Sequence, residues 1–205
     1  RTDEAKAIYM KSRTMIREIV GNSTPEDRFR QRCVIATGDL SVADIMRFNN
    51  DPIPAGVEAI KKGAPIFVDI NMVKSGITKA GHKSEIICVL DEDPPDAKIA
   101  NKYGITRTSA GFLAAREKLD GSIIAIGNAP SALIMVCKLI EKGVRPALII
   151  GLPVGFVNAA ESREMVRNLK IPIPSISCVG TRGGGTPMAV ACVNELVAIA
   201  RESEE

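Results

Sequence analysis

The stretch from residue 123 to residue 162 contains one pattern twice, and this repetition limits the folds open to the chain. In each copy a short apolar run ends at a glycine, Gly127 or Gly151, and a loop of small residues and proline then leads into a helix. The runs are too short for buried helices and are rich in isoleucine, which is typical of strands covered on both faces. A helix predicted over 131–142 separates the two runs. The unit is therefore a strand–helix–strand crossover, which requires parallel strands.

The rest of the chain alternates strand and helix patterns in the same way. Short apolar runs predict further strands at 65–70, 86–90 and 175–179. Helical spacing of apolar residues predicts helices at 4–20, 25–35, 41–48, 54–62, 71–76, 95–103 and 108–118, a helix after 158 and a terminal helix ending near 201. The sequence thus predicts an α/β fold with three α/β/α layers and a central, mostly parallel sheet of about five strands. We interpret residues 1–205 as a single domain with an N-terminal helical segment of about 63 residues.

Composition excludes several classes of function. A formal charge of +3 with only 3% aromatic residues argues against binding to nucleic acid. No apolar run approaches the roughly 20 residues of a spanning helix, and the first residues lack the apolar region of a signal peptide. Five cysteines are scattered without metal-site spacing, so we expect reduced thiols and a cytoplasmic protein that binds no metal.

Side chains that could carry chemistry are few. His82 is the only histidine, which removes the usual zinc sites and the serine and cysteine triads unless His82 itself is the base. It lies in a polar connector and is more typical of an exposed loop. The adjacent carboxylates of Asp91, Glu92 and Asp93 are more typical of a solvated turn than of a cation site.

Four positions fall where predicted strands end, namely Asp69, Gly127, Gly151 and Gly180. Ligands of parallel α/β sheets bind at this carboxyl edge, so we expect the site there. The run 180–185 fits neither a dinucleotide nor a triphosphate motif. Its backbone amides beside an arginine suit carboxylates, and a merely flexible loop explains them equally well.

Laid out in this order, the segments resemble the precorrin-8X methylmutase family, also called cobalt-precorrin-8 methylmutase, over nearly the whole chain. The two most specific matches are Ala125–Leu133 (AIGNAPSAL) and Pro153–Val157 (PVGFV). The other matching stretches are Ile8-Tyr9 with Ser12, Gly63–Ile66 with Asp69, Met72-Val73, Glu85–Cys88, Thr106-Arg107, 159–162 and Gly180–Gly184.

The resemblance implies an enzyme that moves a methyl group from C-11 to C-12 of a corrin precursor within one molecule. It implies no cofactor, and a homodimer whose sites lie near the subunit interface. An apolar macrocycle edged with acetate and propionate groups agrees with a rim of amides and arginine. The substrate-binding positions that we expect are Tyr9, Ser12, Ile35, Thr37, Gly38, Thr78, Thr106, Arg107, Asn128, Ala129, Pro153, Gly155, Arg182 and Gly183.

The chain departs from the family at the position of its histidine, which is Ile35 here. An alkyl side chain neither donates nor accepts a proton, so the catalytic group is unassigned, and the candidates to replace the imidazole are Tyr9, Thr37, Thr78 and His82. Three interpretations remain open. The chain is a methylmutase with altered acid chemistry, a corrinoid-binding relative that does not isomerise, or an enzyme acting on another tetrapyrrole or polycarboxylate.

Overall fold

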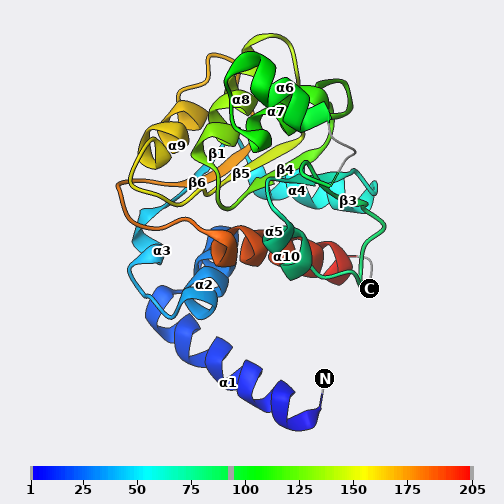
Figure 1. Ribbon diagram of the computed structural model, residues 1–205. Coiled ribbons are helices and arrows are strands. Elements are labelled where there is room, and N and C mark those ends of the chain that lie inside the picture. Colours follow the sequence, from blue (N-terminus) through cyan, green and yellow to red (C-terminus); the bar gives the residue numbers. More distant parts are fainter. Residues whose placement is uncertain (1, 92–94, 204–205) are drawn as a thin grey trace.

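The computed structural model describes residues 2–91 and 95–203 and has three layers, with a mixed sheet between two layers of helices (Figure 1). The described strands are β1 (Met46–Asn49), β2 (Ile66–Val68), β3 (Ile86–Cys88), β4 (Ile123–Ile126), β5 (Leu148–Gly151) and β6 (Ser175–Cys178). They form one sheet in the order β1-β6-β5-β4-β2-β3. All neighbours are parallel except β1, which pairs antiparallel with β6. The predicted three-layer α/β fold is confirmed.

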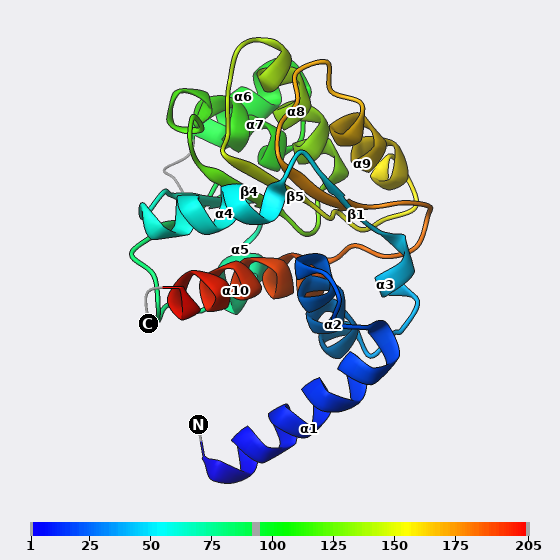
Figure 2. The ribbon, with the colours of Figure 1, turned by 180° about the vertical axis from the view of Figure 1, so that it is seen from behind.

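The helices cover both faces of this sheet. They are α1 (Asp3–Val20), α2 (Pro25–Thr37), α3 (Val42–Ile45), α4 (Pro52–Lys61), α5 (Asn71–Gly76), α6 (Pro95–Tyr103), α7 (Arg107–Ala114), α8 (Pro130–Glu141), α9 (Ala159–Arg167) and α10 (Thr186–Glu202), with a 3₁₀ turn at Arg116–Lys118. Figures 1 and 2 show α7, α8 and α9 over one face and α2, α4, α5 and α10 over the other. In β4, Ile123 and Ala125 join the core under α10, whereas Ile124 and Ile126 join the core under α8. The isoleucine runs are thus buried on both faces, as their composition predicts.

The predicted helix over 41–48 is wrong beyond Ile45, because the chain there forms the edge strand β1. Met46 pairs with Cys178 and Phe48 with Ile176, so the segment completes the open side of β6. The alternation of Met46 and Phe48 with two polar residues is a strand pattern of period two. Pairing with a distant strand decides the conformation of so short a segment, and it adds a sixth strand to the predicted five.

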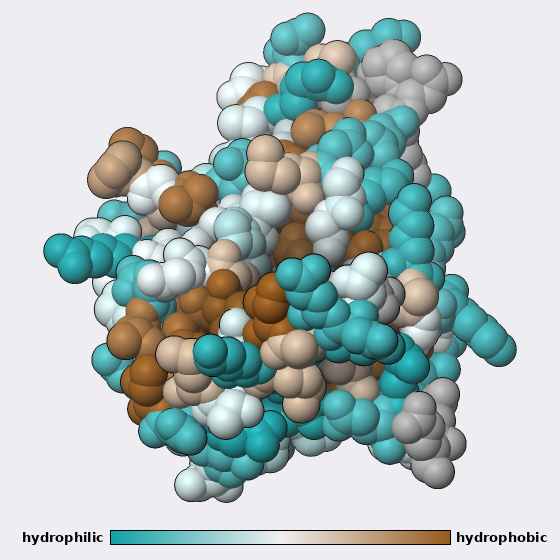
Figure 3. All heavy atoms as spheres, turned by 90° about the horizontal axis from the view of Figure 1, so that it is seen from below, coloured by the Kyte–Doolittle hydropathy of each residue, from teal (hydrophilic) through white to brown (hydrophobic). Residues whose placement is uncertain are grey.

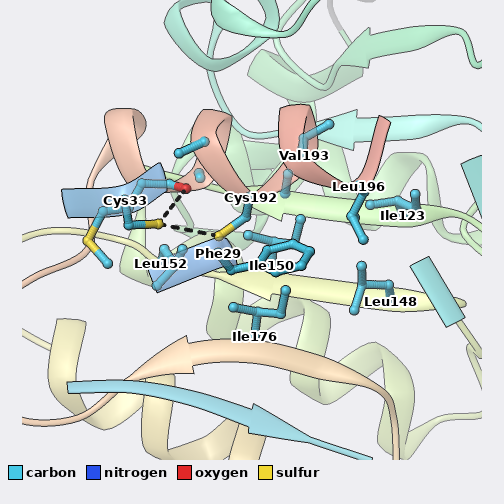
Figure 4. Packing of buried hydrophobic residues seen from close by; sticks show 14 of the residues in the cluster. Phe29, Cys33, Ile123, Leu148, Ile150, Leu152, Ile176, Cys192, Val193 and Leu196 are labelled. Carbon is cyan, nitrogen blue, oxygen red and sulfur yellow. Dashed lines mark hydrogen bonds between the residues drawn. The ribbon is translucent and has the colours of Figure 1, made fainter. Parts of the chain in front are cut away.

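The core between the sheet and the α2–α10 pair is dense and contains cysteine (Figure 4). Phe29 and Cys33 of α2 are fully buried against Ile150 and Ile176 of the sheet. The Cys33 sulfur lies 3.7 Å from the sulfur of Cys192 on α10. All five cysteines are free and buried. This packing fixes the direction of α2 relative to α10.

Helix α1 is the exception to this dense packing, since none of its residues is buried. It projects from the body of the molecule beyond α2 (Figure 2). Its exposed apolar side chains include Ile8, Met10, Met15 and Ile19. Figure 3 shows the molecule from below, the side on which α1 lies in Figure 1, and apolar residues in brown gather across the centre of that surface. Within the described residues, no helix is both long enough and apolar enough to cross a membrane.

Candidate functional site

The carboxyl ends of the parallel strands meet at one edge of the sheet. A buried carboxylate at this edge, that of Asp69, binds the backbone of the loop after β4. Asp69 follows β2 and is fully buried. Its oxygens accept hydrogen bonds from the backbone N–H groups of Gly127 at 3.1 Å, Asn128 at 2.8 Å and Ala129 at 2.7 Å. Burial raises the pKa of Asp69, and these three N–H donors act in the opposite direction. Asp69 therefore holds the loop after β4 in place and is not itself open to a ligand.

Arg163 of α9 links the loop after β5 to the loop after β6. Its side chain is fully buried and donates to the carbonyls of Pro153 at 3.0 Å, Gly183 at 2.9 Å and Gly180 at 2.7 Å. A side chain at Gly184 would collide with the Pro153 carbonyl, so only glycine permits this close approach. The two loops thus form one rigid unit around a buried guanidinium.

The end of α2 lies beside this unit. Ile35 is half-buried in the last turn of α2, and Gly38 ends the helix with a left-handed backbone. The Thr37 hydroxyl donates to the carbonyl of Cys33 at 2.9 Å. Two hydrogen bonds from Ser41 lower the pKa of Asp39, and the charge of Arg182, on the glycine loop after β6, lowers it further. Cys33, two residues before Ile35, also contacts the carbonyl of Met188 in the first turn of α10, which follows the glycine loop, so the end of α2 lies near that loop.

Thr106 and Arg107 begin α7 on the other side of the rim. Thr106 caps the helix by accepting from the N–H of Ser109 at 3.2 Å. Its hydroxyl also lies 2.8 Å from the Ser131 hydroxyl, in the first turn of α8. Since that turn directly follows the loop held by Asp69, the exposed Arg107 borders the same edge.

Two further predicted site residues, Tyr9 and Thr78, lie elsewhere in this chain, along α10. Tyr9 lines a cavity with Glu195 and Ala198 of α10, and Ser12 follows it by one turn of α1. On the other side of α10, the N–H of Thr78 donates to the side chain of Asn194 at 2.8 Å.

His82 lies still farther from the rim, beside Arg201 at the end of α10. The end of α2 contacts Met188 instead, in the first turn of α10. Met188 and Arg201 are about 20 Å apart along the helix axis. The His82 ring is engaged on both nitrogens, by the Thr78 carbonyl at 2.6 Å and the N–H of Ser84 at 3.1 Å. Within one chain, His82 does not reach position 35.

The structure also shows rim residues that sequence reasoning missed. Phe156, in the loop after β5, is 105% exposed, and Val157 beside it is 75% exposed. The sequence signal that could have identified them is two large apolar residues in a loop that contains glycine. Apolar side chains in such a loop are not needed for the core, so they are candidates for contact with a ligand. Of the predicted acidic turn, Glu92 and Asp93 lie outside the described residues, and Asp91 accepts from Lys74 and Asn71, each at 2.6 Å.

Anchored loops at the strand ends, bordered by Arg107, Arg182 and exposed apolar side chains, are typical of an α/β protein that binds a ligand at this edge. The sequence profile of the precorrin-8X methylmutase family matches residues 7–199. The chain belongs to this family. Its members are methylmutases, a type of isomerase, and act in cobalamin biosynthesis.

Individual relatives and solved structures agree with this assignment. The chain is 39% identical over 198 residues to the cobalt-precorrin-8 methylmutase of Methanocaldococcus jannaschii, covering 94% of this chain and 90% of that protein. It is 37% identical to the precorrin-8X methylmutase of Pseudomonas aeruginosa, covering 94% and 95%. The crystal structure of precorrin-8X methylmutase from Thermus thermophilus superimposes with a TM-score of 0.88 at 32% identity, over 97% of both chains.

Proposed function

We propose that this chain isomerises a corrin precursor by moving a methyl group from C-11 to C-12 at the strand rim. The observation that carries this proposal is the combination of groups at that edge. Fixed loops surround Asp69 and Arg163, cations border them at Arg107 and Arg182, and Phe156 is fully exposed. An apolar macrocycle with a carboxylate periphery needs both kinds of contact. Because the shift is intramolecular, holding the ring in a reactive shape supplies part of the catalysis.

The proton chemistry of this site needs a group other than Ile35. Thr37 is the nearest candidate along the chain, since it lies in the same last turn of α2 at the rim, and Tyr9 is the candidate from α1. The alkyl group at position 35 also favours a second function, a corrinoid-binding relative that does not isomerise. In both cases the ring occupies the rim.

We further propose a cytoplasmic homodimer in which the apolar side of α1 packs on a second copy. A helix with no buried residue and with Ile8, Met15 and Ile19 exposed needs such a cover. The dimer would also bring Tyr9 and Ser12 of one chain toward the rim of the other. Light scattering of the purified chain is expected to give twice the chain mass, and a monomer at micromolar concentration would contradict it.

Mixing the purified protein with precorrin-8X, or with its cobalt form, tests the proposed function. Isomerisation changes the conjugation of the ring, so a new visible absorption band is expected to grow with time. Binding without reaction, seen as an immediate and constant spectral shift, would favour the second function. No spectral change at all would contradict both.

Replacing Arg107 by alanine is expected to weaken corrinoid binding by about tenfold or more, because a charge-assisted hydrogen bond to a ring carboxylate is lost. Fluorescence or absorbance titration measures the dissociation constant. Arg116→Ala is the matched control, since this exposed arginine pairs only with neighbouring Glu117 among the described residues. Equal affinity of wild type and Arg107→Ala would exclude Arg107 from the site.

A further inference from the structure

A second cavity, separate from the rim, lies between α1, α2 and α10, and it is rich in arginine. Its volume is about 470 Å³. The residues that line it are Tyr9, Met10, Arg13, Arg17, Asn22, Arg28, Arg32, Glu195, Ala198 and Glu202. Four arginines here face two glutamates, so the walls carry an excess of positive charge.

The two glutamates, Glu195 and Glu202, both pair with Arg28. The Glu195 side chain is 1% exposed and accepts from Arg28 Nε at 2.7 Å and from Arg32 Nη1 at 2.9 Å. The other nitrogens of Arg28 form a bidentate pair with Glu202, at 2.6 and 2.9 Å. The Glu202 pair raises the pKa of Arg28, burial opposes this, and Glu195 adds to the rise. Arg28 is therefore a structural link between α2 and α10, since each of its three nitrogens already pairs with a glutamate.

Arg13 and Arg32 keep unused donors. Arg13 reaches Glu195 only at 3.5 Å, and its side chain is 11% exposed. Its Nη1 atom is buried and has no hydrogen-bond partner among the described residues. Arg32 makes one contact with Glu195, although a guanidinium carries five N–H donors. A buried, unpaired donor on a charged group is unfavourable unless an acceptor binds there.

We propose that this cavity is a subsite for one acetate or propionate carboxylate of the corrin periphery, held by Arg13 and Arg32. The inference rests on the proposed function, because it takes its ligand class from that substrate. A carboxylate supplies two acceptor oxygens in the plane that a guanidinium fork matches. Tyr9 of α1 lines this cavity. The exposed apolar side of α1 faces the second copy in the proposed dimer. One edge of a ring bound between the two copies would therefore enter the cavity.

Two ligands and three variants test the subsite. The ligands are a corrin polycarboxylate and the corresponding polyamide of the same ring, titrated by visible absorption. The variants are Arg13→Gln, Arg32→Gln and the control Arg30→Gln. Arg30 also belongs to α2 but faces away from the cavity, pairing with Asp27 at 2.9 Å and covering the Phe48 ring. Circular dichroism verifies that each variant is folded.

The wild type is expected to bind the carboxylate ring about tenfold or more tightly than the amide ring. Arg13→Gln and Arg32→Gln are expected to lose most of this preference, while Arg30→Gln keeps it. A purely structural role would lower stability without changing the preference between the rings. Retained preference in both cavity variants would overturn the subsite alone. Failure of the wild type to bind either ring would overturn the proposed function and the subsite with it.

Discussion

Replacing Ile35 by histidine is expected to raise the isomerisation rate by about 10²- to 10⁴-fold, the usual contribution of a positioned acid or base. Ile35 is half-buried in the last turn of α2, at the rim formed by the glycine loop. An imidazole at this helix end would replace an alkyl group that transfers no proton. The negative end of the helix dipole also favours its protonated form. Initial rates from visible absorption, at saturating corrin precursor, measure the effect.

Two controls separate proton transfer from mere polarity. Ile35→Gln adds hydrogen-bonding capacity without a titrating group and is expected to stay near the wild-type rate. Ala36→His places the same imidazole one residue away, on the exposed side of the helix end. Only Ile35→His should show a rate that titrates in the range of histidine, near pH 6 to 7. If Ile35→His binds the precursor but reacts no faster than wild type, position 35 is not the missing acid site.

The second large effect is expected at Arg163. Replacing it by methionine leaves the carbonyls of Pro153, Gly180 and Gly183 without their buried donor. The expected loss in free energy of unfolding is about 2–4 kcal/mol, measured by urea denaturation. Because the loops after β5 and β6 then separate, corrinoid binding is expected to fall with it.

Arg167→Met is the matched control on the same helix. Arg167 bonds to Ser177 and to the carbonyl of Cys178, within β6, and does not join the two loops. We expect a smaller loss of stability and unchanged affinity for the ring. Equal losses of affinity in the two variants would remove Arg163 from its role at the rim.

The fold was predictable from sequence wherever local patterns were strong. Isoleucine runs ended by Gly127 and Gly151 mark strands with both faces buried, and β4 and β5 lie where these runs predict. The prediction missed β1, because the conformation of four residues depends more on the strand with which they pair than on their own strand propensity. The edge strand forms only once β6 is present.

The site was predictable in part, for the same physical reason. Strand ends identify the rim, since the carboxyl edge follows from parallel topology. The anchoring by Asp69 and Arg163 depends on contacts with residues up to 60 positions away, which spacing alone does not show. Nor does spacing show that Tyr9 lies beside α10 and apart from Ile35 in a single chain. That separation depends on the direction in which α1 leaves the body.

The most direct test of the central claim follows the migrating carbon itself. A precursor labelled with carbon-13 in the methyl group at C-11 is incubated with the wild type and with Ile35→His, and the products are examined by NMR. Retention of the label in the same molecule, with its signal moved to the C-12 methyl and formed faster by Ile35→His, is the expected result. An unchanged C-11 signal with both proteins, while the ring is bound, would contradict the account.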